Sequence, residues 1–242
     1  YKVWKDYLQY NVHATDRLLR FAIECNVKLF VFISGADVYG TIPARLPADP
    51  WTAANPEDYY QKSKWKAEQL VVKLLRGRIP FVILRPSRIY GAQEHGFLEK
   101  LTSLVKTNAF PLIRKGVKIH LTDVETVGRV VQWLLNSEMT DEAIYNVADR
   151  SPVLLSELVD LIYSFFYSKN YLDYLRLHPV FFKMGENVSR VLQLKQLSLD
   201  FKQISESWYY DITSLSETCP FELPLTMERV AYYLELQHKA VD

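Results

Sequence analysis

Two uninterrupted apolar runs, each followed by a polar loop, constrain the fold of this 242-residue chain more than any other feature. The first run occupies Lys28–Ile33 and the second Pro80–Leu84, with a helical pattern between them. Apolar runs without alternation are typical of strands covered on both faces, as in a parallel sheet. Because strand and helix patterns alternate through the first part of the chain, the sequence predicts an α/β fold with a parallel sheet.

The remaining pattern divides the chain into two parts. Further helices are predicted at 4–25, 60–76, 96–106, 124–135, 157–166 and 227–236, and further strands at 117–121 and 144–148. A segment with four prolines, residues 41–58, predicts a long ordered loop of functional importance. We expect an α/β domain over residues 1–150 and a smaller, mostly helical cap over residues 151–242, interleaved with residues 92–122.

Composition narrows the classes of function. The chain is 49% hydrophobic and 24% charged with a net charge of +1, which is typical of a soluble globular protein and argues against nucleic-acid binding. Cys25 and Cys219 lie far apart, so we expect no disulfide framework and a cytoplasmic location. The histidines have no partners at metal-ligand spacing, which predicts no metal site. No apolar run reaches the length of a membrane span.

The segment Tyr59–Glu68 carries the strongest chemical signal. Tyr60 and Lys64 are four residues apart, so a helix places them on one face, which Ala67 and Val71 continue toward the interior. An ammonium group beside a phenol favours the phenolate and lowers the tyrosine pKa toward that of a general base. Spacing alone leaves another interpretation open, a helix that buries a tyrosine and lets a lysine reach solvent.

Six blocks of the sequence occur in an order that distinguishes between these interpretations. They are Asn11–Thr15, Phe32–Gly40, Pro56–Glu68, Leu84–Gly91, His120–Val124 and Tyr145–Val147. Together they resemble the extended short-chain dehydrogenase/reductase family, the NAD-dependent epimerase/dehydratase group, over nearly the whole chain. The resemblance implies a Rossmann-like parallel sheet, lacking its N-terminal strands here, with a small, mostly helical C-terminal substrate-binding subdomain. It also implies NAD or NADP as the cofactor.

The resemblance assigns roles to matched positions. Tyr60 is the expected acid/base, Lys64 holds the nicotinamide ribose and tunes the tyrosine, and Ser34 completes the catalytic group. The expected cofactor-binding residues are Ile33, Ser34, Tyr60, Lys64, Pro86, Ser87, Arg88 and Ile89. The expected substrate-binding residues are Asn11, Asp37, Tyr39 and Arg88. Two of the matched positions have simpler alternatives, because Asn11 could be a polar helix-surface residue and Asp123 is more often a helix cap than a ligand.

The chain departs from the family pattern at the hydroxyl that contacts the reacting oxygen. The family usually has two adjacent hydroxyl residues before its Val-Tyr-Gly block, and the second position is Gly35 here. Loss of one such donor typically lowers the rate on the order of a hundredfold. Ser34 could substitute if the loop shifts, Thr41 could supply a donor, or catalysis could be lost.

The second departure is the missing phosphate-binding turn. The family binds its dinucleotide through a Gly-x-x-Gly-x-x-Gly turn, and this chain has no glycine before Gly35. We expect an N-terminal segment of roughly three or four strands to precede the printed residues. The alternative is that the printed chain is the natural product and cannot hold NAD tightly.

The resemblance implies an NAD(P)-dependent oxidoreductase, epimerase or dehydratase that acts on a secondary alcohol or ketone by hydride transfer. Nucleotide-sugars and sterol-like molecules are the expected substrates, since Arg114 or Lys118 could meet a phosphate and the aromatic segment 165–199 could line an apolar pocket. The alternative for Arg114 and Lys118 is solvated surface charge, and the alternative for the aromatic segment is an ordinary hydrophobic core. A homodimer through the helices Trp4–Cys25 and Tyr60–Arg76 is also implied. The rival function is a catalytically impaired scaffold or regulatory subunit.

Overall fold

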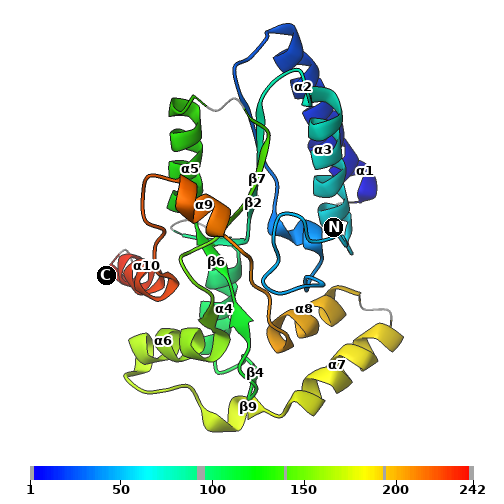
Figure 1. Ribbon diagram of the computed structural model, residues 1–242. Coiled ribbons are helices and arrows are strands. Elements are labelled where there is room, and N and C mark those ends of the chain that lie inside the picture. Colours follow the sequence, from blue (N-terminus) through cyan, green and yellow to red (C-terminus); the bar gives the residue numbers. More distant parts are fainter. Residues whose placement is uncertain (1–2, 92–95, 139–140, 193–194, 240–242) are drawn as a thin grey trace. The chain divides into compact units, whose positions relative to one another are not determined.

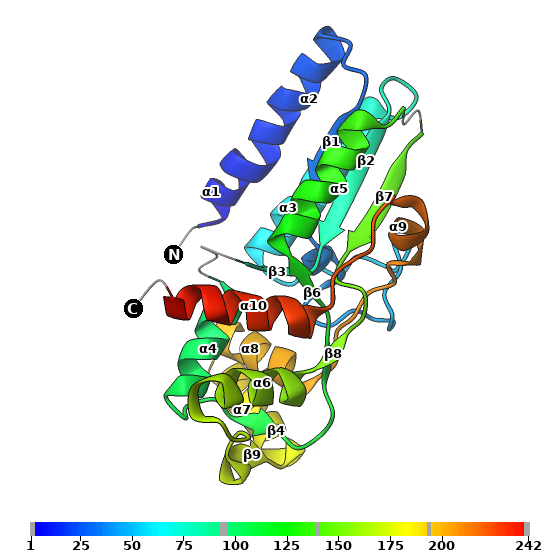
Figure 2. The ribbon, with the colours of Figure 1, turned by 90° about the vertical axis from the view of Figure 1, so that its left-hand side faces the viewer.

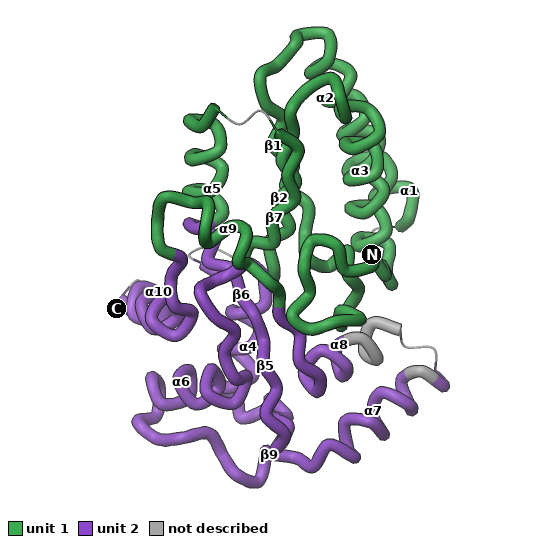
Figure 3. Tube along the Cα trace, viewed as in Figure 1, with its two compact units in different colours: residues 1–87, 127–147, 210–222 green, residues 88–126, 148–209, 223–242 purple. Residues whose placement is uncertain are grey.

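The computed structural model describes residues 3–91, 96–138, 141–192 and 195–239. Two compact units account for the chain, as Figure 3 shows. Unit 1 contains residues 1–87, 127–147 and 210–222, and unit 2 contains residues 88–126, 148–209 and 223–242. Each unit is therefore assembled from three separate segments of the chain. The return of 210–222 to unit 1 is anchored by a backbone bond of 2.8 Å from Asp211 N to Ala48 O.

Unit 1 is built on a parallel sheet, which confirms the predicted fold class. Strands β1 (Phe30–Ile33), β2 (Phe81–Pro86) and β7 (Ala143–Val147) are hydrogen-bonded in the order β1-β2-β7. Both pairings are parallel, with Ile33 opposite Leu84 and Pro86 opposite Val147. The carboxyl ends of all three strands consequently meet at one edge of the sheet, where ligands bind in open parallel sheets.

Helices cover both faces of this sheet. On one face lie α1 (Trp4–Tyr7), a π-helical turn η1 (Leu8–His13), α2 (Ala14–Glu24) and α3 (Tyr59–Leu75), and on the other lies α5 (Val124–Asn136), as Figures 1 and 2 show. The helix expected over 4–25 is thus interrupted by a π turn. The core between α2, α3 and β2 consists of Leu19, Val71, Leu75, Ile79, Phe81 and Ile83. Burial of this apolar face holds the helices on the sheet.

The two strands predicted from apolar runs differ in burial. Every residue of β2 is buried, as expected of a central parallel strand. In β1, by contrast, Phe30 to Phe32 are only partly buried and Ile33 is 43% exposed. The reason is that β1 pairs with β2 alone and forms one edge of the described sheet.

The proline-containing loop after β1 is ordered by specific contacts. It follows a 3-10 turn η2 (Ala36–Tyr39), and Asn55 N donates to Val38 O at 3.0 Å. Gly40 has φ of 92°, and a Cβ at this position would lie 2.6 Å from Asn55 O. Only glycine meets both requirements, so Gly40 lets the loop close against the turn.

Among the described residues, unit 2 combines five helices of two or more turns with short strand pairs. The helices are α4 (Phe97–Lys106), α6 (Leu155–Tyr167), α7 (Pro179–Val191), α8 (Lys195–Ser205) and α10 (Thr226–Lys239), with a 3-10 turn η3 (Asp173–Leu175). The strand pairs are β3 (Arg88–Tyr90) with β6 (Leu121–Asp123), β4 (Leu112–Ile113) with β9 (Arg176–Leu177), and β5 (Lys118–Ile119) with β8 (Val153–Leu154). The strand expected at 117–121 is therefore divided between β5 and β6. In the described part of the chain, no helix is long and apolar enough to cross a bilayer.

Candidate functional site

Lys64 connects helix α3 to the carboxyl end of strand β1. Its Nζ donates to the backbone carbonyl of Ile33 at 2.7 Å, and the ammonium group lies 5.0 Å from the centre of the Phe32 ring. Asp58 begins the helix by accepting from Gln61 N at 2.8 Å, so the first turn of α3 is held by a side-chain cap. This cap and the apolar face of α3 place Lys64 at the edge of the sheet where ligands bind in parallel α/β proteins.

Tyr60 lies one helical turn before Lys64 but is more accessible than the sequence predicted. Ala67 and Val71 on the same face are fully buried, whereas Tyr60 is 40% exposed. Its ring centre lies 6.2 Å from that of Tyr7 in an edge-on arrangement. The predicted inward face of α3 therefore opens to solvent at its N-terminal end.

The electrostatic surroundings of the pair differ from the expectation. Burial, together with the negative charges of Asp37 and Asp58, raises the pKa of Tyr60 to about 12. Burial also lowers the pKa of Lys64, an effect that Glu68 partly opposes. The expected lowering of the tyrosine pKa is absent from this structure, because nearby carboxylates and desolvation both disfavour the phenolate. Tyr60 is consequently a protonated phenol at neutral pH.

Ser34 and Gly35 occupy the two positions where the family pattern has hydroxyl residues. Ser34 is only 5% exposed, and its Oγ has no hydrogen-bond partner within the described residues. A Cβ built on Gly35 would lie 3.7 Å from Asp37 Oδ2 and 4.0 Å from Pro86 O, which is ordinary van der Waals contact. The Asp37 carboxylate thus lies beside the position of the missing hydroxyl, and the backbone there has room for a small side chain.

Asn11 contacts the helix that carries Tyr60. Its Nδ2 donates to Ser63 Oγ at 2.8 Å, and Ser63 Oγ in turn donates to Tyr60 O at 2.7 Å. The π turn η1 that contains Asn11 is anchored by Thr15, whose Oγ1 donates to Asn11 O at 2.6 Å. The structure therefore places Asn11 where it supports the backbone at Tyr60, in a role that the sequence did not predict for it. π turns are frequent at functional sites, and this one brings the amide to α3.

Tyr39, which the sequence predicted to bind substrate, lies inside unit 1 with no exposed surface. Its hydroxyl donates to Asn146 Oδ1 at 2.8 Å and accepts from Arg85 Nη1 at 2.8 Å. Both hydrogen-bonding directions of the phenol are thus used within the protein.

Arg85 and Glu68 form a buried ion pair that sequence analysis missed. Arg85 Nη2 lies 2.6 Å from Glu68 Oε2, and both side chains are less than 5% exposed. Arg85 Nη1 also donates to Pro50 O at 2.9 Å, which joins β2 to the proline-containing loop. No pattern in the sequence connects two charges that lie 17 residues apart on different elements, so no local signal could have identified the pair.

The block Pro86–Ile89, which the sequence predicted to bind cofactor, is divided between the units. Pro86 ends β2 in unit 1, and Ser87 follows it, where Ser87 N donates to Val147 O at 2.9 Å. Arg88 and Ile89 begin unit 2 in strand β3. Arg88 Nη2 donates to Gln203 Oε1 at 2.6 Å, while Arg88 Nε is buried without a partner among the described residues.

A pocket of about 460 Å³ in unit 2 contains the Arg88 side chain. Apolar groups from the region of α4 and from α8 line most of it, and Lys100 and Asp200 add charge. The lining residues are Arg88, Gly96, Phe97, Lys100, Leu101, Leu104, Phe110, Pro111, Asp200, Phe201, Gln203 and Ile204. This pocket is formed mainly by residues 96–111 and 200–204, while part of the segment 165–199, for which an apolar pocket was predicted, lies outside the described side chains.

Asp123 and its neighbours form a buried network in unit 2. Asp123 Oδ1 accepts from Glu125 N at 3.2 Å, which supports the predicted capping of α5, and Asp123 Oδ2 accepts from Arg229 Nε at 2.6 Å. Asp149 accepts from Tyr90 OH at 2.6 Å and is fully buried, and burial raises the pKa of this carboxyl to about 6. The ion pair of Asp123 with Arg229 and the burial of Asp149 were not predicted.

Arg114, a predicted phosphate contact, donates from its Nε to Arg176 O at 2.6 Å.

Comparison with known proteins agrees with the fold and the motif order. The family model described as "Male sterility protein", an NAD-binding family, matches residues 2–131. An Escherichia coli O157:H7 protein, N-acetyl-alpha-D-glucosaminyl-diphospho-ditrans,octacis-undecaprenol 4-epimerase, is 26% identical over 160 residues, which are 63% of this chain and 47% of that protein. A Stigmatella aurantiaca 4-hydroxy-2-methyl-3-oxo-4-farnesyl-3,4-dihydroquinoline-1-oxide ketoreductase is 26% identical over 156 residues, 63% of this chain and 46% of that protein. The chain thus spans about half the length of the curated relatives it matches.

Solved structures share the fold at low sequence identity. UDP-glucuronic acid 4-epimerase from Bacillus cereus in complex with NAD has a TM-score of 0.74 and 14% identity, covering 99% of this chain and 71% of that one. RMD from Pseudomonas aeruginosa complexed with NADPH has a TM-score of 0.67 and 18% identity, covering 94% of this chain and 73% of that one. At these identities, the likeness shows the fold alone.

Proposed function

The chain belongs to the NAD-binding family described as "Male sterility protein", among the short-chain dehydrogenase/reductase-type epimerases and dehydratases, and from this premise we propose that it serves nicotinamide-dependent redox chemistry. The proposed reaction is oxidoreduction, epimerisation or dehydration of a secondary alcohol or its ketone. Tyr60 is the proposed acid/base, with Lys64 and Ser34 in supporting roles.

One observation carries this proposal most directly. Lys64 donates to the Ile33 carbonyl at the carboxyl end of β1, one helical turn from a partly exposed Tyr60. The buried Ser34 hydroxyl at the end of the same strand is without a partner among the described residues. A purely structural tyrosine and lysine on this helix would not require a cation and a hydroxyl at the ligand-binding edge of the sheet.

The residues present fit the nicotinamide end of a dinucleotide. Lys64, Tyr60, Ser34 and Ile33 would hold the nicotinamide ribose, and Pro86 would lie beside the ring. The bound cofactor supplies or accepts the hydride. NAD and NADP are both represented among the structural neighbours, in the epimerase from Bacillus cereus and in RMD, respectively. Either cofactor is compatible with the proposal.

Tyr60 moves the proton in the proposed mechanism. Because its pKa is raised to about 12, Tyr60 carries its proton at neutral pH and is ready to give it to the oxygen of a ketone that is being reduced. In the opposite direction, it receives the alcohol proton only as a phenolate, which burial and the nearby carboxylates disfavour. The chain is therefore better prepared for reduction of a carbonyl than for oxidation of an alcohol.

The pocket of unit 2 supports an amphipathic substrate. Arg88 and Lys100 provide positive charge beside Phe97, Leu101 and Phe201, which suits a molecule with an anionic part and an apolar part. The positive charge would suit the diphosphate of a nucleotide-sugar, and the apolar side chains would suit a sterol-like ketone. We propose that Arg88 meets an anionic part of the substrate, because its Nε is desolvated and without a partner among the described residues.

Substitution of Tyr60→Phe tests the proposal against a matched control. In the protein with its cofactor, Tyr60→Phe should lower turnover by at least about a hundredfold, the lower end of the range for general acid catalysis, while cofactor binding persists. The control is Tyr59→Phe, because Tyr59 precedes Tyr60 on α3 and is 53% exposed. UDP-sugars, dTDP-sugars and steroid ketones form the substrate panel, and a shift of the melting temperature with NAD or NADP reports binding. Equal turnover of both variants contradicts the assignment.

Gly35 favours a second candidate function, a catalytically impaired family member that acts as a scaffold or regulatory subunit. The donor expected at this position is missing, and the raised pKa of Tyr60 weakens it as a base. For a scaffold, Tyr60→Phe changes neither turnover nor partner binding. No panel substrate then shifts the melting temperature, even with NAD or NADP present.

We also propose that α1–α2 and α3 form a homodimer interface in a cytoplasmic protein. Tyr10, Leu18 and Phe21 on this helical layer are 67%, 59% and 62% exposed, respectively. Exposed apolar side chains that share a surface mark interaction sites more often than isolated ones. Sedimentation analysis of Phe21→Glu is the test, since a monomer is expected from the variant and a dimer from the unaltered protein.

A further inference from the structure

Unit 1 carries a second pocket, separate from the residues around Tyr60. It has a volume of about 580 Å³, which lies within the range typical of small-molecule sites. Its walls come from the proline-containing loop, the C-terminal part of α3, strand β7 and helix α9 (Thr213–Thr218). The lining residues are Asp49, Pro50, Trp51, Val72, Arg76, Phe81, Glu142, Ala143, Ile144, Tyr145, Asp211, Thr213, Ser214 and Glu217.

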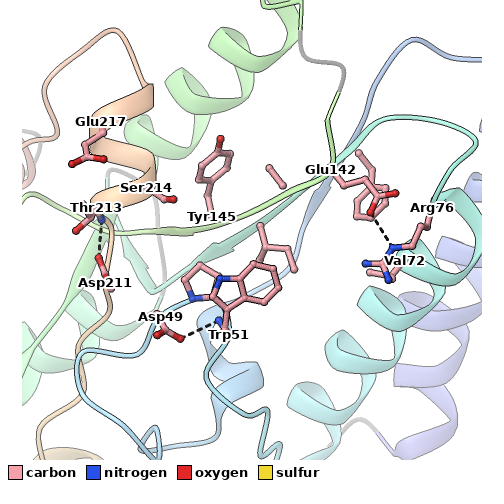
Figure 4. A pocket seen from close by; sticks show the side chains of 14 residues that line it. Asp49, Trp51, Val72, Arg76, Glu142, Tyr145, Asp211, Thr213, Ser214 and Glu217 are labelled. Atoms are coloured by element: carbon pink, nitrogen blue, oxygen red, sulfur yellow. Dashed lines mark hydrogen bonds and ion pairs between the residues drawn. The ribbon is translucent and has the colours of Figure 1, made fainter.

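Trp51 is the most unusual side chain of this pocket. It is 85% exposed, although tryptophan is normally one of the more buried residues. The backbone of Trp51 is nevertheless fixed, because Trp51 N donates to Asp49 Oδ1 at 3.0 Å. Figure 4 shows the indole in the middle of the pocket, with Asp49 and Asp211 on one side and the Arg76–Glu142 pair on the other. A large aromatic face is therefore held open to solvent inside a cavity.

Negative charge exceeds positive charge around this face. Glu142 is paired with Arg76 at 3.0 Å and Asp49 with Arg45 at 3.3 Å, whereas Asp211 and Glu217 form no ion pair with a lysine or arginine among the described residues. Hydrogen bonds from Thr213 lower the pKa of Asp211, so this carboxylate is ionised at neutral pH. Such a pocket repels anions and attracts cations.

The spread of these carboxylates selects the kind of cation. Within the described residues, no three His, Cys, Asp or Glu side chains come close enough together to hold a metal ion. A cation that meets several separated carboxylates and an indole face at once has to be larger than a metal ion. Alkylammonium and guanidinium groups have this size, and both bind well over the face of tryptophan.

We propose that this pocket binds an organic cation, with its ammonium or guanidinium group over the Trp51 indole and near the carboxylates of Asp211 and Glu217. The cation belongs either to a free amine or to an arginine or lysine side chain of another polypeptide. This site is independent of the redox chemistry proposed above, because none of its lining residues belongs to the group around Tyr60 and Lys64.

Calorimetric titration with agmatine tests the proposal, since agmatine carries a guanidinium and an ammonium group and no carboxylate. Saturable binding is expected, with a Kd of about 1 mM or below at low salt. Because exposed charges are screened by salt, binding should weaken when NaCl is raised from about 0.05 M to 0.5 M. Neutral N-butylurea and anionic glutarate should not bind.

Substitutions locate the site. Trp51→Ala should weaken agmatine binding about 2- to 30-fold, the range expected for loss of a cation–π contact, and Glu217→Gln should weaken it as well. Matched controls are Tyr174→Ala, which removes an aromatic ring that is 70% exposed, and Glu24→Gln, which removes an exposed carboxylate outside the pocket. Both pocket side chains are exposed, so the variants should keep the melting temperature of the unaltered protein.

A parallel titration with a capped tripeptide that has arginine in the middle identifies the source of the cation. Tighter binding of the tripeptide than of agmatine supports a polypeptide partner, and the reverse supports a free amine. The proposal is overturned if neither probe binds saturably, or if both bind Trp51→Ala as tightly as the unaltered protein.

Discussion

Replacement of Glu68 by glutamine should destabilise the protein through the charge that it leaves behind. The ion pair of Glu68 with Arg85 is buried, with side-chain exposures of 2% and 4% and a closest distance of 2.6 Å. Removing one partner of a buried pair typically costs about 3–5 kcal/mol, because the remaining charge is desolvated and unpaired. Arg85 keeps its bonds to Tyr39 and Pro50, so we expect a loss near the lower end, about 3 kcal/mol.

Urea unfolding measures this loss, and heating gives a second readout. For a chain of this size, about 3 kcal/mol corresponds to a decrease of the melting temperature of roughly 6–12 °C. The matched control is Glu24→Gln, an exposed carboxylate, for which a change within about 0.5 kcal/mol is expected. Glu68→Gln combined with Arg85→Met should be more stable than Glu68→Gln alone, since no unpaired charge remains. A loss below about 1 kcal/mol for Glu68→Gln would refute the reasoning.

Three further substitutions test other parts of the structure. Gly35→Ser should leave the melting temperature unchanged, because a Cβ there has ordinary contacts to Asp37 and Pro86. The same substitution should raise kcat at least about tenfold, because it restores a hydrogen-bond donor. An unchanged kcat argues that the missing hydroxyl at position 35 does not limit the rate. Gly91→Ala should lower the free energy of unfolding in urea by about 1–3 kcal/mol, because its Cβ would overlap the Val124 side chain. A free energy of unfolding equal to that of the unaltered protein contradicts this prediction. The pKa of Asp149 is about 6 in the folded protein and 3.8 for the free side chain, so the folded protein binds this proton more tightly than the unfolded chain. Protonation of Asp149 therefore adds about 3 kcal/mol to the free energy of unfolding. This contribution is fully present below pH 3.8 and is lost as the pH rises through 6. Asp149→Asn should flatten the pH dependence of unfolding over this interval, and an unaltered slope excludes Asp149 as its source.

The strand and helix that carry the site were predictable because their signals are local. The apolar run of β2 and the helical period of α3 differ from the observed bounds by only one or two residues. The shared face of Tyr60 and Lys64 follows directly from helical geometry. The burial of Tyr60 was predicted wrongly. Helical periodicity indicates which side of a helix faces the interior, but not where along the helix that side becomes exposed to solvent.

Contacts that support the site depend on residues far apart in the chain. Asn11 reaches Ser63 across 52 positions, and Lys64 reaches the Ile33 carbonyl across 31. The pKa of Tyr60 was predicted to fall and is raised instead, because its value depends on which charges and how much protein surround the phenol. The periodic pattern of a sequence does not indicate which charges surround a side chain or how deeply it is buried.

From its residue order alone, the chain specified a parallel α/β sheet, the helix with its tyrosine and lysine, and membership in a nicotinamide-binding family. Those features follow from period, composition and motif order, which act over a few residues at a time. Folding in three dimensions decided which charges are buried together, which hydroxyl is without a partner among the described residues, and where Trp51 is held open to solvent. Burial and electrostatic interaction depend on distance in space, and the folded backbone alone sets that distance.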